Sequence, residues 1–237
     1  MVEWLRHHSG SGVLWSRHRR HGDGWVGRRG AHTWQVMLVI GLTGSIGTGK
    51  SEVARLLLAL GAVVINADEV GHEAYKPNSD SWREVVKAFG EEILQPSGEI
   101  DRKKLGAVVF SDPEQLARLN HIMHPRMARM VAQRLEKLRS QGTEVAVVEA
   151  ALLFEAGWDS LVDEVWATDS PLETVIQRLQ DRNGMSAEEV LKRVDSQMDR
   201  AERLAKAHVV VDNSGDVIAL ESAVGNLWDS RVKRRIA

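Results

Sequence analysis

The sequence has 237 residues, of which 31 are basic and 33 acidic, and it contains no cysteine, which excludes disulfides, thiolate metal sites and thiol nucleophiles. A net charge of −2 gives no support for nucleic-acid binding, and no apolar run approaches the roughly 18 residues that a membrane span needs. A hydrophobic fraction of 43% is enough to bury a core, so we expect a soluble cytoplasmic protein whose oligomeric state the sequence leaves open.

Residues 1–36 differ in composition from the rest of the chain. They hold six Arg, five His, six Gly and four Trp, no Lys, and only Glu3 and Asp23 as acids. Because they show neither apolar periodicity nor the apolar core of a secretory signal, we predict a disordered extension. An overlong gene start, with Met37 as the true first residue, is favoured over an organelle-targeting segment, which would be rich in Ser. A contact of the Arg and Trp residues with nucleic acid or a membrane is a weaker alternative.

The segment that follows predicts a strand, a phosphate-binding loop and a helix. The apolar run Met37–Ile40 leads into Gly44-Ser45-Ile46-Gly47-Thr48-Gly49-Lys50-Ser51, which has the Walker A spacing. In such a loop glycines allow backbone N–H groups to converge on phosphate oxygens, the lysine reaches the terminal phosphates, and the serine can bind Mg²⁺. The residues predicted to bind a nucleoside triphosphate are Gly44, Gly47, Thr48, Gly49, Lys50 and Ser51.

The context supports this motif against the alternative of an ordinary glycine-rich turn. Apolar residues recur at helical spacing after the loop, and Gly61 stands where the helix would end. The residues of this apolar helix face are Val53, Leu56, Leu57 and Leu60. A dinucleotide fingerprint is disfavoured, because the glycines do not have its spacing.

Downstream, short apolar runs alternate with helical stretches, which is typical of an α/β fold with a parallel sheet covered on both faces. The predicted further strands are 63–66, 145–148, 164–167 and 208–211. Between Pro77 and Gln141 the pattern is helical, with turn signals at 96–98 and 111–113. We therefore predict a helical substrate domain at about 77–141, inserted between the second and third strands.

Two carboxylates are predicted to follow or end strands at the edge of the sheet where ligands bind. Asp68 closes the second strand, where it could orient an attacking hydroxyl and take its proton; the alternative is a helix N-cap. Glu149 ends the third strand, where a Walker B carboxylate would act through Mg²⁺ or its waters.

The segment from Arg178 to Arg203 is rich in arginine. Arg178 and Arg182 lie four residues apart before Asn183-Gly184, which predicts a helix end and a possible hinge. Guanidinium groups on a lid would stabilise a phosphoryl group in transfer, whereas a solvated charged face is the plain alternative. His124-Pro125-Arg126 is predicted to open a helix in the insertion.

With these motifs the sequence resembles the dephospho-coenzyme A kinases, which phosphorylate the ribose 3′-hydroxyl of dephospho-CoA with ATP in the last step of coenzyme A synthesis. The similar segments follow the family's order: GLTGSIGTGKS at 41–51, LGA at 60–62, AD at 67–68, FG at 89–90, GEIDR at 98–102, FSD at 110–112, LNHIMHP at 119–125, LLFE at 152–155, QRLQDR at 177–182, Arg193, SQM at 196–198 and DNSG at 212–215. One departure is Asn66, which stands where the family usually has an aspartate.

The resemblance implies a P-loop NTPase fold like that of nucleoside-monophosphate kinases, with three layers, the helical insertion and a lid at about 178–200. It implies ATP and Mg²⁺ as cofactors and dephospho-CoA as the small-molecule partner. Asp68, Lys50 and Arg182 are then the expected catalytic residues. Arg178 and Asn213 are expected to join the loop in binding ATP, Asp68 and His124 to bind the acceptor, and Ser51 and Glu149 to hold the metal.

Two other functions remain open at this point. One is a kinase of the same fold that acts on a nucleotide or another small molecule. The other is a GTPase switch, since Asp68-Glu69-Val70-Gly71 matches a D-x-x-G element. The chain has no N-K-x-D stretch to recognise guanine, and the long helical insertion suits an acceptor site better.

Overall fold

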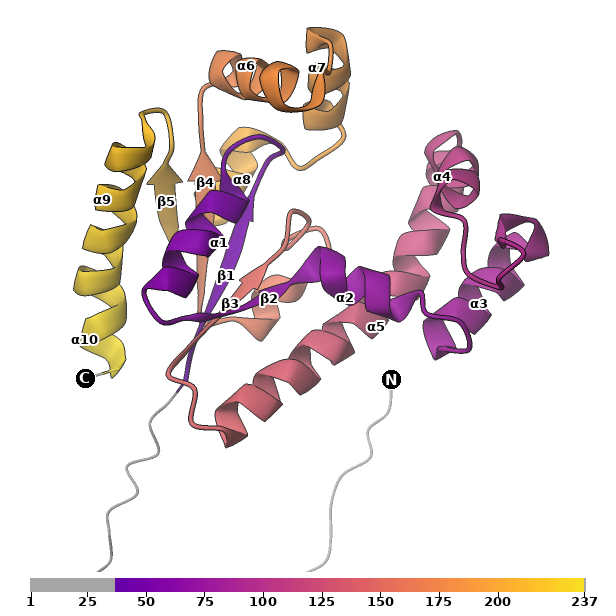
Figure 1. Ribbon diagram of the computed structural model, residues 1–237, viewed down its shortest axis with the longest axis horizontal. Helices are drawn as coiled ribbons and strands as arrows, with labels where there is room; N and C mark the ends of the chain where they lie inside the picture. The colour runs from indigo at the N-terminus through magenta and orange to yellow at the C-terminus, as the bar shows by residue number, and fades with distance from the viewer. Residues whose placement is uncertain (1–36, 237) are drawn as a thin grey trace, which may run out of the picture. The chain divides into compact units, whose positions relative to one another are not determined.

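The computed structural model describes residues 37–236, and the predicted extension at 1–36 lies outside them. Parallel strands form a five-stranded sheet in the order β2-β3-β1-β4-β5 (Figure 1). The strands are β1 (Leu38–Gly44), β2 (Val63–Asn66), β3 (Val145–Glu149), β4 (Glu164–Asp169) and β5 (Val209–Asp212). The predicted parallel sheet is confirmed. β1 is longer than the apolar run indicated, because it pairs with β4 as far as Gly44.

α-Helices follow β1, β2, β4 and β5, as the alternating pattern predicted, whereas only a short 3₁₀ helix lies between β3 and β4. They are α1 (Lys50–Ala59), α2 (Ala67–Ala74), α3 (Asp80–Phe89), α4 (Arg102–Phe110), α5 (Pro113–Ser140), α6 (Leu172–Asn183), α7 (Ala187–Asp195), α8 (Arg200–Lys206), α9 (Val217–Leu227) and α10 (Lys233–Ile236). The shorter helical segments are the 3₁₀ helices η1 (Glu91–Ile93) and η2 (Trp158–Leu161) and the π-helix η3 (Trp228–Val232). Within residues 37–236, no helix combines the length and the apolar character required to cross a bilayer.

The two faces of the sheet carry separate hydrophobic cores, because successive side chains of a strand point to opposite faces. Leu38, Ile40 and Leu42 of β1 face a core shared with α1, α9 and η3, whereas Met37 and Val39 face a core shared with α2, α5 and η2. This three-layer arrangement places the carboxyl ends of the strands at one edge, where parallel α/β sheets bind their ligands.

The helix after the loop differs from its prediction at one residue. Val53, Leu56 and Leu57 are buried as expected, but Leu60 is exposed. The helix ends at Ala59, Leu60 is its C-cap, and Gly61 turns the chain at a φ of 108°. Leu60 therefore lies beyond the apolar face that the periodicity assigned to it.

The region between β2 and β3 is helical and contains a third hydrophobic core. Apart from an isolated bridge between Leu94 and Ile100, the described residues 77–141 form no strand. The long helix α5 joins this core to the sheet, since its Leu119 and Met123 pack in the third core while Val131 and Leu135 pack beneath the sheet. A continuous helix therefore connects the insertion to the strands that carry the site.

The prediction that His124-Pro125-Arg126 opens a helix is wrong. This segment lies inside α5. The helix begins at Pro113, after an N-cap by Asp112. A proline within a helix removes one backbone N–H and disturbs the carbonyls of the preceding turn. In the same turn the Arg126 guanidinium donates to the carbonyl of Ile122 at 2.6 Å.

Glu164, at the amino end of β4, connects the C-terminal segment to the core. Its buried carboxylate accepts hydrogen bonds from Trp166 Nε1 at 2.9 Å and from Arg231 at 2.7 Å, and Arg235 lies at 3.4 Å. Burial alone would raise the pKa of Glu164, but the hydrogen bonds from Arg231 and Trp166 and the nearby arginine charges lower it below its usual value. The ionised carboxylate therefore stabilises the fold.

We expect Glu164→Gln to lower the free energy of unfolding by about 1–2 kcal/mol, the scale of a hydrogen bond to a charged group. Because the folded-state pKa lies below the ordinary value of 4.5, the contribution is fully present above that pH and disappears as the pH falls through the folded-state pKa. Denaturant unfolding from pH 7 to pH 3 should thus show the difference between parent and variant shrinking with acid. Glu136→Gln, which removes an exposed ion pair with Arg139, is the matched control.

Candidate active site

The phosphate loop joins the end of β1 to the start of α1. Gly47 and Gly49 have positive φ values of 78° and 92°, a conformation that L side chains rarely adopt. A Cβ atom at Gly49 would also collide with the side-chain amide of Asn213. Thr48 fixes the loop from within, since its hydroxyl donates to the carbonyl of Ser45 at 2.8 Å and lies 2.7 Å from the hydroxyl of Thr168 on β4.

A buried carboxylate, Glu149, lies at the centre of the strand ends. Glu149 is only 5% exposed and is the last residue of β3, the position that the sequence predicted. Lys50 Nζ and Ser51 Oγ donate to Oε1 at 3.1 and 2.8 Å, and Asn66 Nδ2 donates to Oε2 at 2.9 Å. The carboxylate therefore connects the phosphate loop to the end of β2.

Asn66, not Asp68, is the N-cap of α2. Its Oδ1 accepts the backbone N–H groups of Asp68 at 2.8 Å and Glu69 at 3.2 Å, while its Nδ2 donates to Glu149. The alternative role of Asp68 as a cap is thus wrong. The Asp68 side chain is exposed in the first turn of α2, where the helix dipole favours a negative charge.

Asn66 uses both halves of its amide, and this leads to a testable prediction. Asn66→Ala should lower the free energy of unfolding by about 1–3 kcal/mol, since it removes a cap and leaves a buried charged acceptor short of a donor. Asn66→Asp retains the cap but cannot donate to Glu149, so it should not restore stability. Denaturant unfolding of both variants at pH 7 measures this, and full recovery by Asp would show that only the cap matters.

The residues predicted to hold a metal fit a nucleotide-borne Mg²⁺. Ser51 Oγ and Glu149 Oε1 are hard oxygen donors 2.8 Å apart, of the kind that Mg²⁺ prefers. Within residues 37–236 there is no group of three or more His, Cys, Asp or Glu that could hold a metal by itself. Mg²⁺ commonly completes its coordination with substrate phosphates and water, so this small donor set suits an ion that arrives with a nucleotide.

Two further residues predicted to bind nucleotide, Arg178 and Asn213, lie together beside the loop. Asn213 is buried and its Nδ2 donates to the carbonyl of Thr48 at 3.0 Å. Arg178 on α6 donates to the Asn213 carbonyl at 3.0 Å and to the Ser170 hydroxyl at 3.1 Å. The structure therefore connects α6, the end of β5 and the phosphate loop through hydrogen bonds.

Arg182 lies on α6 as predicted, and α6 ends at Asn183 with Gly184 as its left-handed C-cap. The Arg182 side chain is exposed and donates to Asn183 Oδ1 at 2.8 Å. Among residues 37–236 no hydrogen bond or ion pair joins Arg182 to the phosphate loop, so its catalytic role stays a prediction. The helices α6 and α7 pack together through Val175, Leu179 and Val190.

His124, predicted to bind the acceptor, is half-buried on α5. Burial lowers the pKa of its imidazole, and the charge of Glu155 partly opposes this effect. The ring is therefore largely neutral at pH 7, when it can both donate and accept a hydrogen bond.

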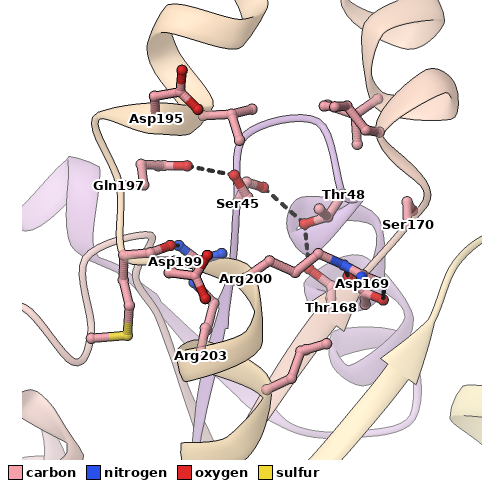
Figure 2. Close-up of a pocket in the computed structure, with 15 residues that line it drawn as sticks. Ser45, Thr48, Thr168, Asp169, Ser170, Asp195, Gln197, Asp199, Arg200 and Arg203 are labelled. Carbon is pink, nitrogen blue, oxygen red and sulfur yellow. Dashed lines mark hydrogen bonds and ion pairs between the residues drawn. The ribbon is translucent and has the colours of Figure 1, made fainter.

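Sequence reasoning assigned no role to Gln197, Arg200 or Arg203, which line a cavity beside the loop together with Ser45 and Thr48 (Figure 2). Gln197 Oε1 accepts from Ser45 Oγ at 2.7 Å and from the backbone N–H of Ile46 at 3.0 Å. The arginine-rich composition of this segment was a signal, but it did not distinguish the inward residues from the solvated ones.

The matches to known proteins agree with this geometry. Residues 38–219 match the family model described as "Dephospho-CoA kinase". The chain belongs to the dephospho-CoA kinase family. A dephospho-CoA kinase from Geobacter sulfurreducens is 45% identical over 195 residues, covering 82% of this chain and 99% of the relative. One from Dehalococcoides mccartyi is 41% identical, covering 83% and 99%.

Solved structures confirm the P-loop kinase fold. A Thermus thermophilus structure named TT1252 aligns with a TM-score of 0.70 and 34% identity, covering 82% of this chain and 98% of that one. Dephospho-CoA kinase from Campylobacter jejuni aligns with a TM-score of 0.63 and 26% identity, covering 83% and 98%. This dephospho-CoA kinase family member is thus a kinase, and its family uses ATP as a substrate.

Proposed function

We propose that this protein transfers the γ-phosphoryl group of ATP to the ribose 3′-hydroxyl of dephospho-CoA, producing coenzyme A and ADP. The observation that carries the proposal is the family match across residues 38–219, which spans the phosphate loop, the helical insertion and the arginine-rich segment. The cluster of Lys50, Ser51 and Glu149 supports it, because it offers a cation and oxygen donors where a triphosphate would lie.

In this reaction the phosphate loop and Lys50 bind and neutralise the triphosphate. The loop supplies backbone donors and the positive end of α1, and Lys50 supplies a point charge near the transferring group. Phosphoryl transfer passes through a loose transition state, so positioning and charge stabilisation provide most of the acceleration. Lys50 Nζ lies 3.1 Å from Glu149 Oε1, which holds the ammonium beside the loop.

Asp68 is the residue we assign to the acceptor hydroxyl. Its exposed carboxylate can accept a hydrogen bond from the 3′-hydroxyl, orient it for in-line attack and receive its proton as the new bond forms. The cap formed by Asn66 holds the first turn of α2 in place, since it binds the Asp68 backbone N–H. Asn66 thus acts as a positioning residue for the catalytic carboxylate.

The metal contribution is limited to one place. Ser51 and Glu149 would hold Mg²⁺ with the nucleotide, and the ion would supply neutralisation of the phosphate charge. Glu149 keeps one oxygen bonded to Asn66, which fixes the orientation of its carboxylate.

The helical insertion at about 77–141 is the proposed acceptor domain. A cavity of about 540 Å³ between the end of α2 and the start of α4 is lined by Tyr75, Lys76, Arg102 and Lys103, together with the acidic Glu99 and Asp101. These cations suit an acceptor that carries phosphate groups, and the Arg102 guanidinium lies 6.0 Å from the centre of the Tyr75 ring. His124 on α5 is the further residue we assign to acceptor binding.

The segment at about 178–200 is the proposed lid. Arg178 already contacts the nucleotide side of the site through Ser170 and Asn213, which supports its role in binding ATP. Arg182 is the exposed lid residue that we assign to the transferring phosphoryl group. A cytoplasmic location for the reaction stays a prediction.

The proposal is tested by ADP release in the presence of different acceptors. Parent protein with Mg²⁺ and ATP is given dephospho-CoA, AMP, CMP or adenosine at equal concentration. We expect rapid turnover with dephospho-CoA as acceptor and not with AMP, CMP or adenosine. Rapid turnover of a nucleoside monophosphate without turnover of dephospho-CoA would assign the protein to another small-molecule kinase activity. Hydrolysis of GTP in the absence of any acceptor would favour a GTPase.

A further inference from the structure

Arg203 on α8 is a buried arginine without an anionic partner. The residue is only 3% exposed, its Nε has no hydrogen-bond acceptor, and its Nη2 donates to the carbonyl of Met198 at 2.6 Å. Among residues 37–236 no carboxylate forms an ion pair with it, whereas Arg126, Arg134, Arg200 and Arg231 each have one. A buried guanidinium is costly unless it is paired, and it keeps its charge at any ordinary pH.

The carboxylates whose charges act on Arg203 form their hydrogen bonds with other groups. Glu155 accepts the Met198 N–H at 3.0 Å, and Asp199 caps α8 by accepting the Glu202 N–H at 3.1 Å. Asp169 accepts two hydrogen bonds from the Arg200 guanidinium. Burial lowers the pKa of Arg203, and the charges of Glu155, Asp199 and Asp169 raise it. These carboxylates stabilise the buried charge of Arg203 at longer range, without forming an ion pair with it.

Arg203 lines the same cavity as the phosphate loop. This cavity of about 280 Å³ lies between Ser45, Thr48, the end of β4 and the segment 194–204 (Figure 2). Its lining also includes the carboxylates of Asp169, Asp195 and Asp199, of which Asp169 is paired with Arg200. The hydroxyl of Ser45 and the N–H of Ile46 converge there on one oxygen of Gln197. Converging donors and an unsatisfied cation are what a cavity for anionic oxygens requires.

We propose that Arg203 contacts the terminal phosphoryl group of bound ATP and is a further catalytic residue of this kinase. The inference rests on the proposed function in that ATP is the phosphoryl donor. In the transfer the bond from γ-phosphorus to the β–γ bridging oxygen breaks, the bond to the acceptor oxygen forms, and the acceptor proton leaves to Asp68. Arg203 donates hydrogen bonds to the non-bridging oxygens and neither gains nor loses a proton.

The test separates this role from a structural one by comparing ATP with ADP. Calorimetric titration without acceptor measures the affinities of parent, Arg203→Met and Arg203→Lys for Mg²⁺-ATP and Mg²⁺-ADP. We expect Arg203→Met to bind ATP at least about tenfold more weakly, with ADP affinity changed by less than about threefold, and kcat lowered at least about a hundredfold. The thermal midpoint without nucleotide should stay unchanged or rise, because a buried unpaired charge has been removed.

Other outcomes overturn the inference. Equal losses of ATP and ADP affinity, or a kcat within about threefold of the parent, would show that Arg203 only supports the fold. Arg203→Lys keeps the charge without the planar fork and should fall between parent and Met; if Met does not fold, a Lys variant with parental ATP preference and kcat refutes the role. Arg139→Met, at an exposed ion pair, is the control. Failure of the parent to bind ATP would instead overturn the proposed function itself.

Discussion

Asp68→Asn is expected to lower kcat with dephospho-CoA by on the order of 10² to 10⁴, the range for a positioned general base. The substitution keeps the shape of the side chain but removes its charge and basicity. Because Asn66 rather than Asp68 caps α2, the variant should fold normally and lose at most about 1 kcal/mol of stability through the helix dipole. ATP affinity, thermal midpoint and kcat are measured on one preparation.

The control for Asp68 is Glu69→Gln, which removes the neighbouring carboxylate from the same turn. The backbone N–H groups of Asp68 and Glu69 both donate to Asn66 Oδ1, so the two variants change side chains at the same helix end. We expect Glu69→Gln to retain nearly full turnover. An Asp68→Asn enzyme within about threefold of the parent kcat would remove Asp68 from the chemistry.

Lys50→Met should lower kcat by at least about a hundredfold, the scale for loss of a preorganised electrostatic group. The effect on kcat should exceed that on ATP affinity, since the ammonium matters most as charge moves toward the leaving oxygen. The thermal midpoint should also fall, because Lys50 is the ion-pair partner of the buried Glu149. Steady-state kinetics and thermal unfolding together measure both effects.

The comparison for Lys50 is Lys233→Met, which breaks an exposed ion pair with Asp229 far along the chain. Surface ion pairs contribute little, so this variant should match the parent in kcat and nearly match it in stability. Near-normal turnover of Lys50→Met would mean that the loop does not hold the triphosphate as proposed.

The parts of the fold that were predictable depend on local sequence. The strand, loop and helix around Lys50 follow from an apolar run, a glycine spacing and a helical periodicity, which are adjacent in the sequence. Glu149 was placed correctly because a residue at the end of a buried strand must lie at the ligand edge of a parallel sheet. The dephospho-CoA kinase family was also predictable, since its motifs occur in order along the chain.

The errors arose where tertiary contacts decide the local structure. Pro125 looked like a helix start, but α5 continues through it because the helix is packed on both the insertion core and the sheet. Asp68 and Asn66 are both acceptable caps by residue type. In the structure Asn66 Oδ1 accepts the first backbone N–H groups of α2, and the bond from Asn66 Nδ2 to Glu149 holds the amide in place. That bond joins residues 83 positions apart, which no local pattern reports.

The cavity beside the loop was unpredictable for the same reason. Gln197 reaches Ser45 across 152 positions, and the orphaned Nε of Arg203 is visible only once α8 is packed against β4. In sequence, Arg203 has the same features as Arg193 or Arg200, which are exposed. Burial, rather than residue type, singles it out as a phosphate-binding candidate.

The central claim is that the terminal phosphoryl group of ATP reaches the ribose 3′-hydroxyl. Phosphorus NMR of the product formed by the parent protein from Mg²⁺-ATP and dephospho-CoA tests it most directly. We expect one new 3′-phosphomonoester resonance, in equal amount to the ADP released, which is absent without protein. Inorganic phosphate in place of that resonance, or a phosphate on another hydroxyl of the acceptor, would contradict the claim.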